Sequence, residues 1–179
     1  MDVIERVLIT KEELAKNAKE LGARISRDYE GKDLMLVGVL KGGVVFLADL
    51  AREITIPTDM DFISVSSYGN SSKSSGVVRI IKDLDTDIAG KDILIVEDII
   101  DTGLTLKHLT ELLHTRGPAS IKICAALDKP SRRQADIVID YKGIEIPDEY
   151  VIGYGLDYAG KYRNIPEVCV LKREVYENG

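Results

Sequence analysis

Leu94-Ile95-Val96-Glu97-Asp98-Ile99-Ile100-Asp101-Thr102-Gly103-Leu104-Thr105-Leu106 is the stretch that decides the fold of this 179-residue chain. Its first part, residues 92–96, is short, apolar and rich in β-branched side chains, which predicts a buried strand. A polar turn at residues 101–105 follows, and leucines at 106, 109, 112 and 113 then predict a helix. A strand, a turn and a helix in this order form half of a βαβ unit. The stretch therefore predicts an α/β fold whose ligands bind beyond the carboxyl ends of its strands.

The turn itself predicts a phosphate site. Backbone N–H groups at the start of a helix, together with the helix dipole, favour a bound anion. Thr102 and Thr105 add hydroxyl donors, and Gly103 lets the backbone approach a ligand closely. The plainer interpretation is that Asp101 or Thr102 only caps the helix.

The two carboxylates that follow the strand, Glu97 and Asp98, need a different ligand because a phosphate would repel them. A sugar diol would satisfy them, and so would Mg²⁺ bound between a diol and a diphosphate. Mg²⁺ is held in this way by one or two carboxylates together with substrate oxygens and water. The alternative is an ordinary polar strand end.

Composition limits the class of protein. A content of 45% hydrophobic and 30% charged residues is typical of one globular domain with a sizeable core. The net charge of −6 argues against a nucleic-acid partner. No apolar run approaches the roughly 20 residues of a membrane span, and the N-terminus lacks a secretory signal, so we expect a cytoplasmic protein. Cys124 and Cys169 lie in apolar runs and are expected to be buried free thiols.

A second strand, turn and helix precedes the first. A capping-box pattern at residues 10–13 opens a helix that runs to about Tyr29. Residues 34–40 then predict a buried strand, which ends in Lys41-Gly42-Gly43 before a helix over residues 44–53. By itself this turn could be a plain connection with a solvated lysine.

Further strands are predicted at residues 59–65, 77–82, 120–127 and 136–140. The serine-rich segment between the first two, about residues 66–77, could be a flexible hairpin loop or a lid that closes over a ligand. Five of the eight tyrosines fall within residues 141–162, and aromatic rings provide faces on which a flat heterocycle can stack.

Residues 96–105 resemble the signature of type I phosphoribosyltransferases, and the form Glu-Asp-Ile-Ile-Asp-Thr-Gly is most similar to the hypoxanthine-guanine branch. The turn at residues 40–43, the Ser67-Tyr68 pair, Asp128-Lys129-Pro130 and residues 147–166 extend the resemblance over nearly the whole chain. It implies an α/β type I phosphoribosyltransferase fold, with a central, mostly parallel twisted sheet flanked by helices.

The resemblance also implies one domain with two parts. The core spans about residues 10–140. A small hood is formed by about residues 1–9 and 141–179, with the N-terminal strand, residues 3–9, paired to it. The lid corresponds to about residues 66–77 and contains Ser67 and Tyr68.

The resemblance implies a binding site for 5-phosphoribosyl-1-diphosphate. The turn would anchor the 5-phosphate, the lysine loop and an arginine would meet the diphosphate, and carboxylates would hold the ribose and Mg²⁺. The residues implied are Thr102, Gly103, Leu104 and Thr105 for the phosphate; Lys41, Gly42 and Arg163 for the diphosphate; and Glu97, Asp98 and Asp157 for the ribose hydroxyls and Mg²⁺. Family members often hold a strained peptide just before this lysine, and the sequence leaves open whether Leu40-Lys41 is cis.

The purine would bind on the other side of the ribose. By resemblance Lys129 donates to O6 of the purine, Tyr150 stacks on the base, Val151 contacts its edge and Asp157 lies nearby. Many relatives have Phe where this chain has Tyr150. Asp101 would manage a proton at N7, as the catalytic base or acid.

The implied reaction transfers ribose 5-phosphate from 5-phosphoribosyl-1-diphosphate to N9 of hypoxanthine or guanine, giving IMP or GMP and diphosphate, in a homodimer or homotetramer. Two alternatives remain. One is an RNA-binding pyrimidine regulator of the same fold, which needs a basic face that a net charge of −6 does not favour. The other is a xanthine-directed transferase, which shares the phosphate turn.

Overall fold

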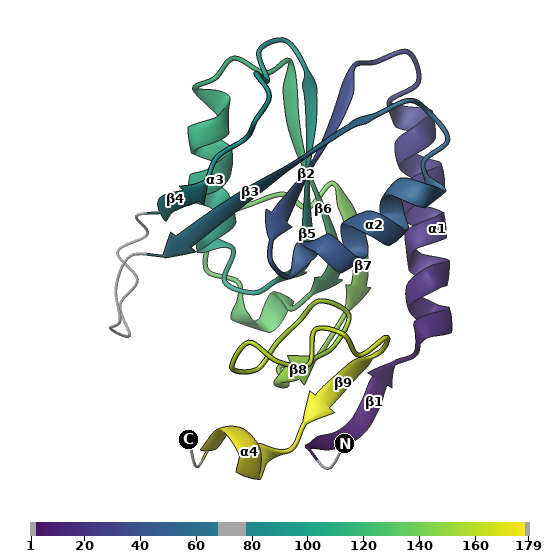
Figure 1. Ribbon diagram of the computed structural model, residues 1–179, viewed down its shortest axis with the longest axis vertical. Helices are drawn as coiled ribbons and strands as arrows, with labels where there is room; N and C mark the ends of the chain where they lie inside the picture. Colours follow the sequence, from purple (N-terminus) through teal and green to yellow (C-terminus); the bar gives the residue numbers. More distant parts are fainter. Residues whose placement is uncertain (1–2, 68–77, 178–179) are drawn as a thin grey trace.

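A six-stranded sheet forms the centre of the computed structural model, which describes residues 3–67 and 78–177 (Figure 1). Its strand order is β4-β3-β2-β5-β6-β7, and every neighbouring pair is parallel except β3 with β4. The strands are β2 (Leu34–Leu40), β3 (Asp59–Ser67), β4 (Val78–Lys82), β5 (Asp92–Ile100), β6 (Ser120–Asp128) and β7 (Tyr141–Glu145). The predicted fold class, a mostly parallel sheet flanked by helices, is confirmed.

Helices cover both faces of this sheet. α1 (Lys11–Asp28) and α2 (Gly43–Glu53) lie on one face, and α3 (Leu104–His114) lies on the other (Figure 1). The side chains of the central strands alternate between the two cores: Leu94 and Val96 pack toward α1 and α2, whereas Ile93 and Ile95 pack toward α3. Burial on both faces explains why these strands are continuously apolar in sequence.

The predicted capping box opens α1. Glu13 N–H donates to Thr10 Oγ1 at 3.3 Å, and Thr10 N–H donates to Glu13 Oε2 at 2.8 Å. No helix in the two described ranges is long and apolar enough to cross a membrane. Both cysteines are buried and free, as predicted.

Both ends of the described chain meet in a second, antiparallel sheet of order β1-β9-β8, formed by β1 (Ile4–Ile9), β8 (Val151–Ile152) and β9 (Val168–Leu171). The predicted pairing of the N-terminal strand with the C-terminal segment is therefore present. A short helix, α4 (Arg173–Glu177), follows β9 near the N-terminus (Figure 1). β7 belongs to the large sheet, although the sequence assigned residues from 141 onward to the hood.

Two strand predictions need correction. β5 continues to Ile100 instead of ending at Val96, because Ile99 and Ile100 still pair with Leu127 and Asp128 of β6. Residues 136–140 are not a strand. Asp140 accepts the Ile123 N–H with its side chain at 2.9 Å, and the strand begins only at the next residue, where Tyr141 pairs with Cys124.

The predicted lid lies mostly outside the described residues. Ser66 and Ser67 end β3, whereas Tyr68 and the rest of the segment to residue 77 are not described.

Candidate active site

Three strands of the large sheet end at the same edge, because parallel strands share their direction. Lys41 and Gly42 follow β2, Asp101 follows β5 and Lys129 follows β6. The register of the strands places these three strand ends side by side, because Gly38 of β2 pairs with Val96 of β5, and Ile100 of β5 pairs with Asp128 of β6. Most of the residues singled out in the sequence therefore come from one edge, where ligands bind in open α/β sheets.

The turn after β5 surrounds a small cavity of about 150 Å³, lined by Glu97, Asp101, Thr102, Gly103 and Thr105 among others. Gly103 has φ +76 and precedes α3 without any side-chain cap hydrogen bond. Leu104 N–H faces Thr102 Oγ1 at 3.4 Å, which is long for a hydrogen bond. The first N–H groups of α3 therefore remain largely available to an anion.

A larger cavity of about 500 Å³ lies between the two sheets. Its wall contains Asp98, Asp101, Lys129, Tyr150, Val151 and Asp157. Asp101 is the predicted catalytic residue, and it lines this cavity as well as the small one. Its Oδ1 is buried and has no hydrogen-bond partner among the described residues, while Oδ2 lies 3.9 Å from Arg132 Nη1. A carboxylate oxygen of this kind can accept a proton from a ligand that enters the cavity.

Glu97 and Asp98 are neighbours in β5, and their side chains point to opposite faces of the sheet. Glu97 lines the small cavity and Asp98 lines the large one. Desolvation, and then the charge of Asp98, raises the pKa of Glu97 well above its usual range. Desolvation raises the pKa of Asp98 to about 6, against the Ile99 N–H that its Oδ1 accepts at 2.7 Å. A bound cation would therefore stabilise the charged form of both carboxylates, and a diol could donate hydrogen bonds to them.

The donor set suits Mg²⁺ only together with a substrate. The Glu97 carboxylate has no hydrogen-bond partner in the described part of the chain. Within residues 3–67 and 78–177, no three Asp, Glu, His or Cys side chains converge on a metal position. Asp157 is engaged already, because its Oδ1 pairs with Arg163 at 2.7 Å and its Oδ2 accepts the Gly160 N–H at 2.8 Å. This favours contact with a metal through water over direct ligation by Asp157.

The lysine loop lies against Asp98. A Cβ added to Gly42 would lie 1.7 Å from Asp98 Oδ2, so a larger residue here would have to displace the Asp98 carboxylate. The Leu40-Lys41 peptide is cis, which answers the question that the sequence left open. Arg163 Nη1 donates to the Gly155 carbonyl at 2.7 Å. Lys41, Gly42 and Arg163 do not themselves line the two cavities, but Gly42 lies against Asp98 and Arg163 pairs with Asp157, and both carboxylates line the large cavity together with Asp101.

The predicted purine-binding residues do share the large cavity. Lys129 is 6% exposed, and its ammonium donates to the Glu149 carbonyl at 2.8 Å. Tyr150 is 40% exposed and stacks on Tyr176 of α4, with ring centroids 5.0 Å apart. Val151 is buried and pairs with Val170.

Sequence reasoning missed the residues that support these groups. Arg133 Nε donates to the Asp101 carbonyl at 3.0 Å, and its guanidinium pairs with the buried Asp128. The N–H groups of Gln134 and Ala135 both donate to the Thr102 carbonyl, at 2.9 and 3.0 Å. Arg132 and Arg133 are adjacent basic residues in the sequence, but nothing in the sequence indicates which group Arg133 contacts. No pattern in the sequence indicated that Tyr176 would lie beside Tyr150.

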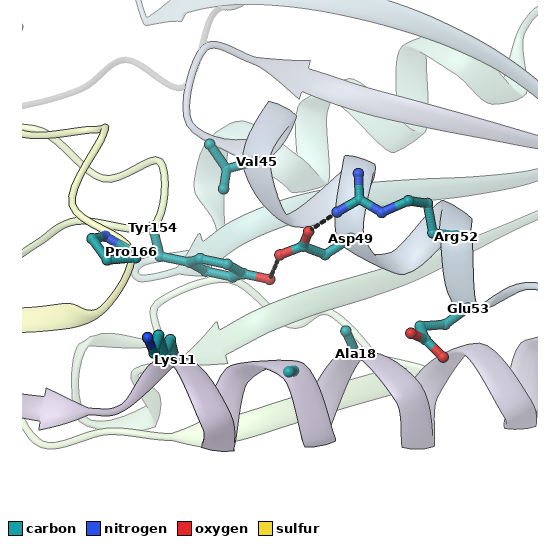
Figure 2. A pocket seen from close by; sticks show the side chains of 9 residues that line it. Lys11, Ala18, Val45, Asp49, Arg52, Glu53, Tyr154 and Pro166 are labelled. Carbon is teal, nitrogen blue, oxygen red and sulfur yellow. Dashed lines mark hydrogen bonds and ion pairs between the residues drawn. The ribbon is translucent and has the colours of Figure 1, made fainter.

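A third cavity of about 370 Å³ lies between α1, α2 and the loop that carries Tyr154 and Pro166 (Figure 2). None of the residues predicted for the site lines it. The chemistry-bearing side chains therefore concentrate at the edge where β2, β5 and β6 end, and this cavity is separate from them.

Comparison with known proteins agrees with this arrangement. The model of the phosphoribosyl transferase domain family matches residues 8–159. A hypoxanthine-guanine phosphoribosyltransferase from Bacillus subtilis (strain 168) is 57% identical over 175 residues, which cover 98% of this chain and 97% of the relative. A crystal structure of a hypoxanthine phosphoribosyltransferase from Staphylococcus aureus has a TM-score of 0.95 at 50% identity, covering 98% of this chain and 95% of that one. A hypoxanthine phosphoribosyl transferase from Trypanosoma cruzi has a TM-score of 0.94 at 43% identity, covering 99% and 96%. The chain is therefore a member of the phosphoribosyl transferase family, as its motifs predicted.

Proposed function

We propose that the protein is a purine salvage transferase of this family. It transfers ribose 5-phosphate from 5-phosphoribosyl-1-diphosphate to N9 of hypoxanthine or guanine and releases diphosphate, so that the products are IMP and GMP. Relatives over nearly the whole chain carry the name hypoxanthine-guanine phosphoribosyltransferase, which supports both the enzyme class and the purine acceptor. We also propose that the protein is a cytoplasmic homodimer or homotetramer.

One observation carries the proposal: Asp101 lines both cavities at the edge of the sheet. The small cavity suits a phosphate group, and the large one has an aromatic ring and a buried ammonium, which suit a 6-oxopurine. A residue common to both lies where the reacting sugar and base would meet. This supports Asp101 as the group that accepts the N7 proton as N9 bonds to the sugar and afterwards releases that proton to solvent.

Lys129 would distinguish the bases. An ammonium has donors only, so it can bind the O6 of hypoxanthine or guanine but not the amino group of adenine. Its present bond to the Glu149 carbonyl keeps it at the wall of the large cavity. Tyr150, which is 40% exposed, supplies an aromatic ring for stacking.

Glu97 and Asp98 would hold the ribose hydroxyls and, with Asp157 acting through water, a Mg²⁺ ion. Mg²⁺ bound there would supply positive charge to the departing diphosphate. Lys41, Gly42 and Arg163 would add donors for the same leaving group, and the turn from Thr102 to Thr105 would anchor the 5-phosphate. Ser67 and Tyr68 would belong to a lid that excludes water.

The test is a panel of bases. Purified protein with Mg²⁺ and 5-phosphoribosyl-1-diphosphate is offered hypoxanthine, guanine, xanthine, adenine and uracil separately, and nucleotide is followed by absorbance and chromatography. The proposal expects product from hypoxanthine and guanine. Product from xanthine alone would favour the xanthine-directed alternative. No product from any base, with RNA binding controlled by a pyrimidine nucleotide, would favour the regulator.

A further inference from the structure

Three consecutive residues near the candidate diphosphate-binding residues Lys41, Gly42 and Arg163 have a left-handed backbone conformation. The φ angles of Gly153, Tyr154 and Gly155 are +92, +50 and +97. Residues with a side chain rarely adopt positive φ angles, and they keep this conformation only where contacts with the surrounding structure hold them in it. Here Tyr154 N–H donates to the Ile165 carbonyl at 2.8 Å, and Gly155 N–H donates to the Arg163 carbonyl at 3.1 Å. The segment is therefore held tightly in a conformation that directs Tyr154 away from its own loop.

The Tyr154 side chain reaches α2. It is 5% exposed, and its hydroxyl donates to Asp49 Oδ2 at 2.8 Å (Figure 2). The other oxygen of Asp49 accepts from Arg52, and the Tyr154 ring lies 6.4 Å from that of Phe46. This hydrogen bond is partly buried, and a hydrogen bond to a carboxylate is among the stronger ones in proteins. Tyr154 thus connects the loop to the middle of the helix.

α2 carries the lysine loop at its N-terminus. The helix begins at Gly43, directly after Lys41 and Gly42, and Gly42 as its N-cap makes no side-chain hydrogen bond. Within the turn, the Val44 N–H to Lys41 carbonyl contact is long, at 3.4 Å. An α-helix is stiff over the roughly 10 Å that separate Gly42 from Asp49. The position of the loop therefore follows the position of the helix.

The neighbouring residue contacts the same loop directly. A Cβ on Gly155 would lie 2.1 Å from the Gly42 carbonyl oxygen. The Gly155 carbonyl also accepts from Arg163 Nη1 at 2.7 Å. Tyr154 and Gly155 thus contact α2, the lysine loop and Arg163, which are the elements that would together hold the leaving group.

We propose that Tyr154 is a positioning residue for the diphosphate. Its hydrogen bond to Asp49 sets α2, and with it Lys41 and Gly42, at the correct distance from Arg163. This inference rests on the proposed function, because it assumes that these groups bind diphosphate. Tyr154 itself touches no reacting atom.

The test is Tyr154→Phe, which removes only the hydroxyl. We measure the affinity of inorganic diphosphate and of 5-phosphoribosyl-1-diphosphate, each with Mg²⁺, by isothermal titration calorimetry, and the KM values of both substrates. Affinity for both ligands should fall roughly three- to tenfold, while the KM for hypoxanthine stays unchanged. Asp49→Asn, which keeps an acceptor, should show a smaller loss.

Tyr141→Phe is the matched control. Tyr141 also donates its hydroxyl to a carboxylate at 2.8 Å, that of Asp28, but far from the lysine loop. It should lower thermal stability without changing either affinity. Wild-type affinity in Tyr154→Phe, or an equal loss in both Tyr→Phe variants, would overturn the inference. A wild-type protein that binds both ligands yet transfers nothing would contradict the proposed function alone, whereas one that binds neither would overturn both.

Discussion

The two carboxylate oxygens of Asp101 have different surroundings. Oδ1 is buried without a hydrogen-bond partner among the described residues, and Oδ2 faces Arg132 at 3.9 Å. Asp101→Asn keeps the size of the side chain but cannot hold a transferred proton. Turnover should fall by more than about tenfold, while the affinity for 5-phosphoribosyl-1-diphosphate stays within about twofold. Steady-state kinetics and calorimetry check this, and unchanged turnover would remove the proton-transfer role.

The ionised carboxylate of Asp98 should lower the free energy of unfolding of the ligand-free protein at pH values above the pKa of Asp98. Desolvation raises that pKa from 3.8 to about 6, so the folded state binds the proton more tightly than the unfolded state. The associated stability is present below pH 3.8 and is lost as the pH rises through about 6. Asp98→Asn should therefore equal the wild type near pH 4 and exceed it by about 1–3 kcal/mol at pH 7.5, as urea denaturation would show.

Asp83 provides a control with the opposite sign. The Arg116 guanidinium, which lies 2.7 Å away, lowers the pKa of Asp83. Asp83→Asn should thus lose stability at pH 7.5. If Asp98→Asn is also less stable than the wild type at that pH, burial of the charged Asp98 carboxylate does not destabilise the folded protein.

At the scale of residues, the sequence revealed those groups that follow a strand directly. Lys129 could be expected at a strand end because an apolar run precedes it, whereas Asp101 was expected in a turn beyond a strand that ended at Val96 and in fact follows the longer β5 directly. The roles predicted for both residues came from the family resemblance. Tyr154 could not be predicted, since its partner Asp49 lies 105 positions away and no local pattern connects them.

At the scale of elements, the turn after β5 is supported from behind by the segment that follows β6. Arg133 binds the Asp101 carbonyl and Asp128, and it packs so close that a Cβ on Gly103 would lie 3.1 Å from its Cδ. Arg133→Met should loosen the turn. The affinity for 5-phosphoribosyl-1-diphosphate should fall roughly three- to tenfold, measured by calorimetry.

Arg116→Met is the comparison for this prediction. Arg116 pairs with Asp83 through both terminal nitrogens, at 2.7 and 2.8 Å, and it does not line the phosphate cavity. Its loss should affect stability only. Equal affinities in the two variants would show that Arg133 does not shape the turn.

The predicted boundaries of strands were wrong where pairing with another strand determines them. The polar residues Glu97 and Asp98 look like a strand end, but β6 continues to pair with the chain as far as Ile100. Residues 136–140 are apolar enough to predict a strand, yet the side chain of Asp140 takes the N–H that a neighbouring backbone would use. Local sequence does not report a partner that lies elsewhere in the chain.

At the scale of the whole molecule, the large cavity lies where the two sheets meet, and Lys129 connects them. It follows β6 of the large sheet and binds the Glu149 carbonyl just before β8 of the small one. Lys129→Met should raise the KM for hypoxanthine by about tenfold or more, since a charged donor to O6 is lost, and leave the KM for 5-phosphoribosyl-1-diphosphate within about twofold.

The control is Lys91→Met at the opposite edge of the sheet, where Lys91 pairs with Asp33 and Asp59 at 3.1 and 2.9 Å. It should leave both KM values unchanged. A hypoxanthine KM that does not respond to Lys129→Met would remove this residue from base recognition.

The large sheet could be predicted from its apolar strands, but the small sheet could be placed only by resemblance to relatives. Its strands come from both ends of the chain, with Ile4 opposite Leu171, and β8 has only two residues. Hydrophobic periodicity does not identify so short an element.

The central claim is transfer of the phosphoribosyl group to a purine, and ³¹P NMR tests it most directly. The protein is incubated with Mg²⁺, 5-phosphoribosyl-1-diphosphate and hypoxanthine, and each phosphorus species is counted over time. We predict one diphosphate for each nucleotide 5-phosphate, with no loss of substrate when hypoxanthine is left out. Release of diphosphate without nucleotide, or no reaction at all, would contradict the account.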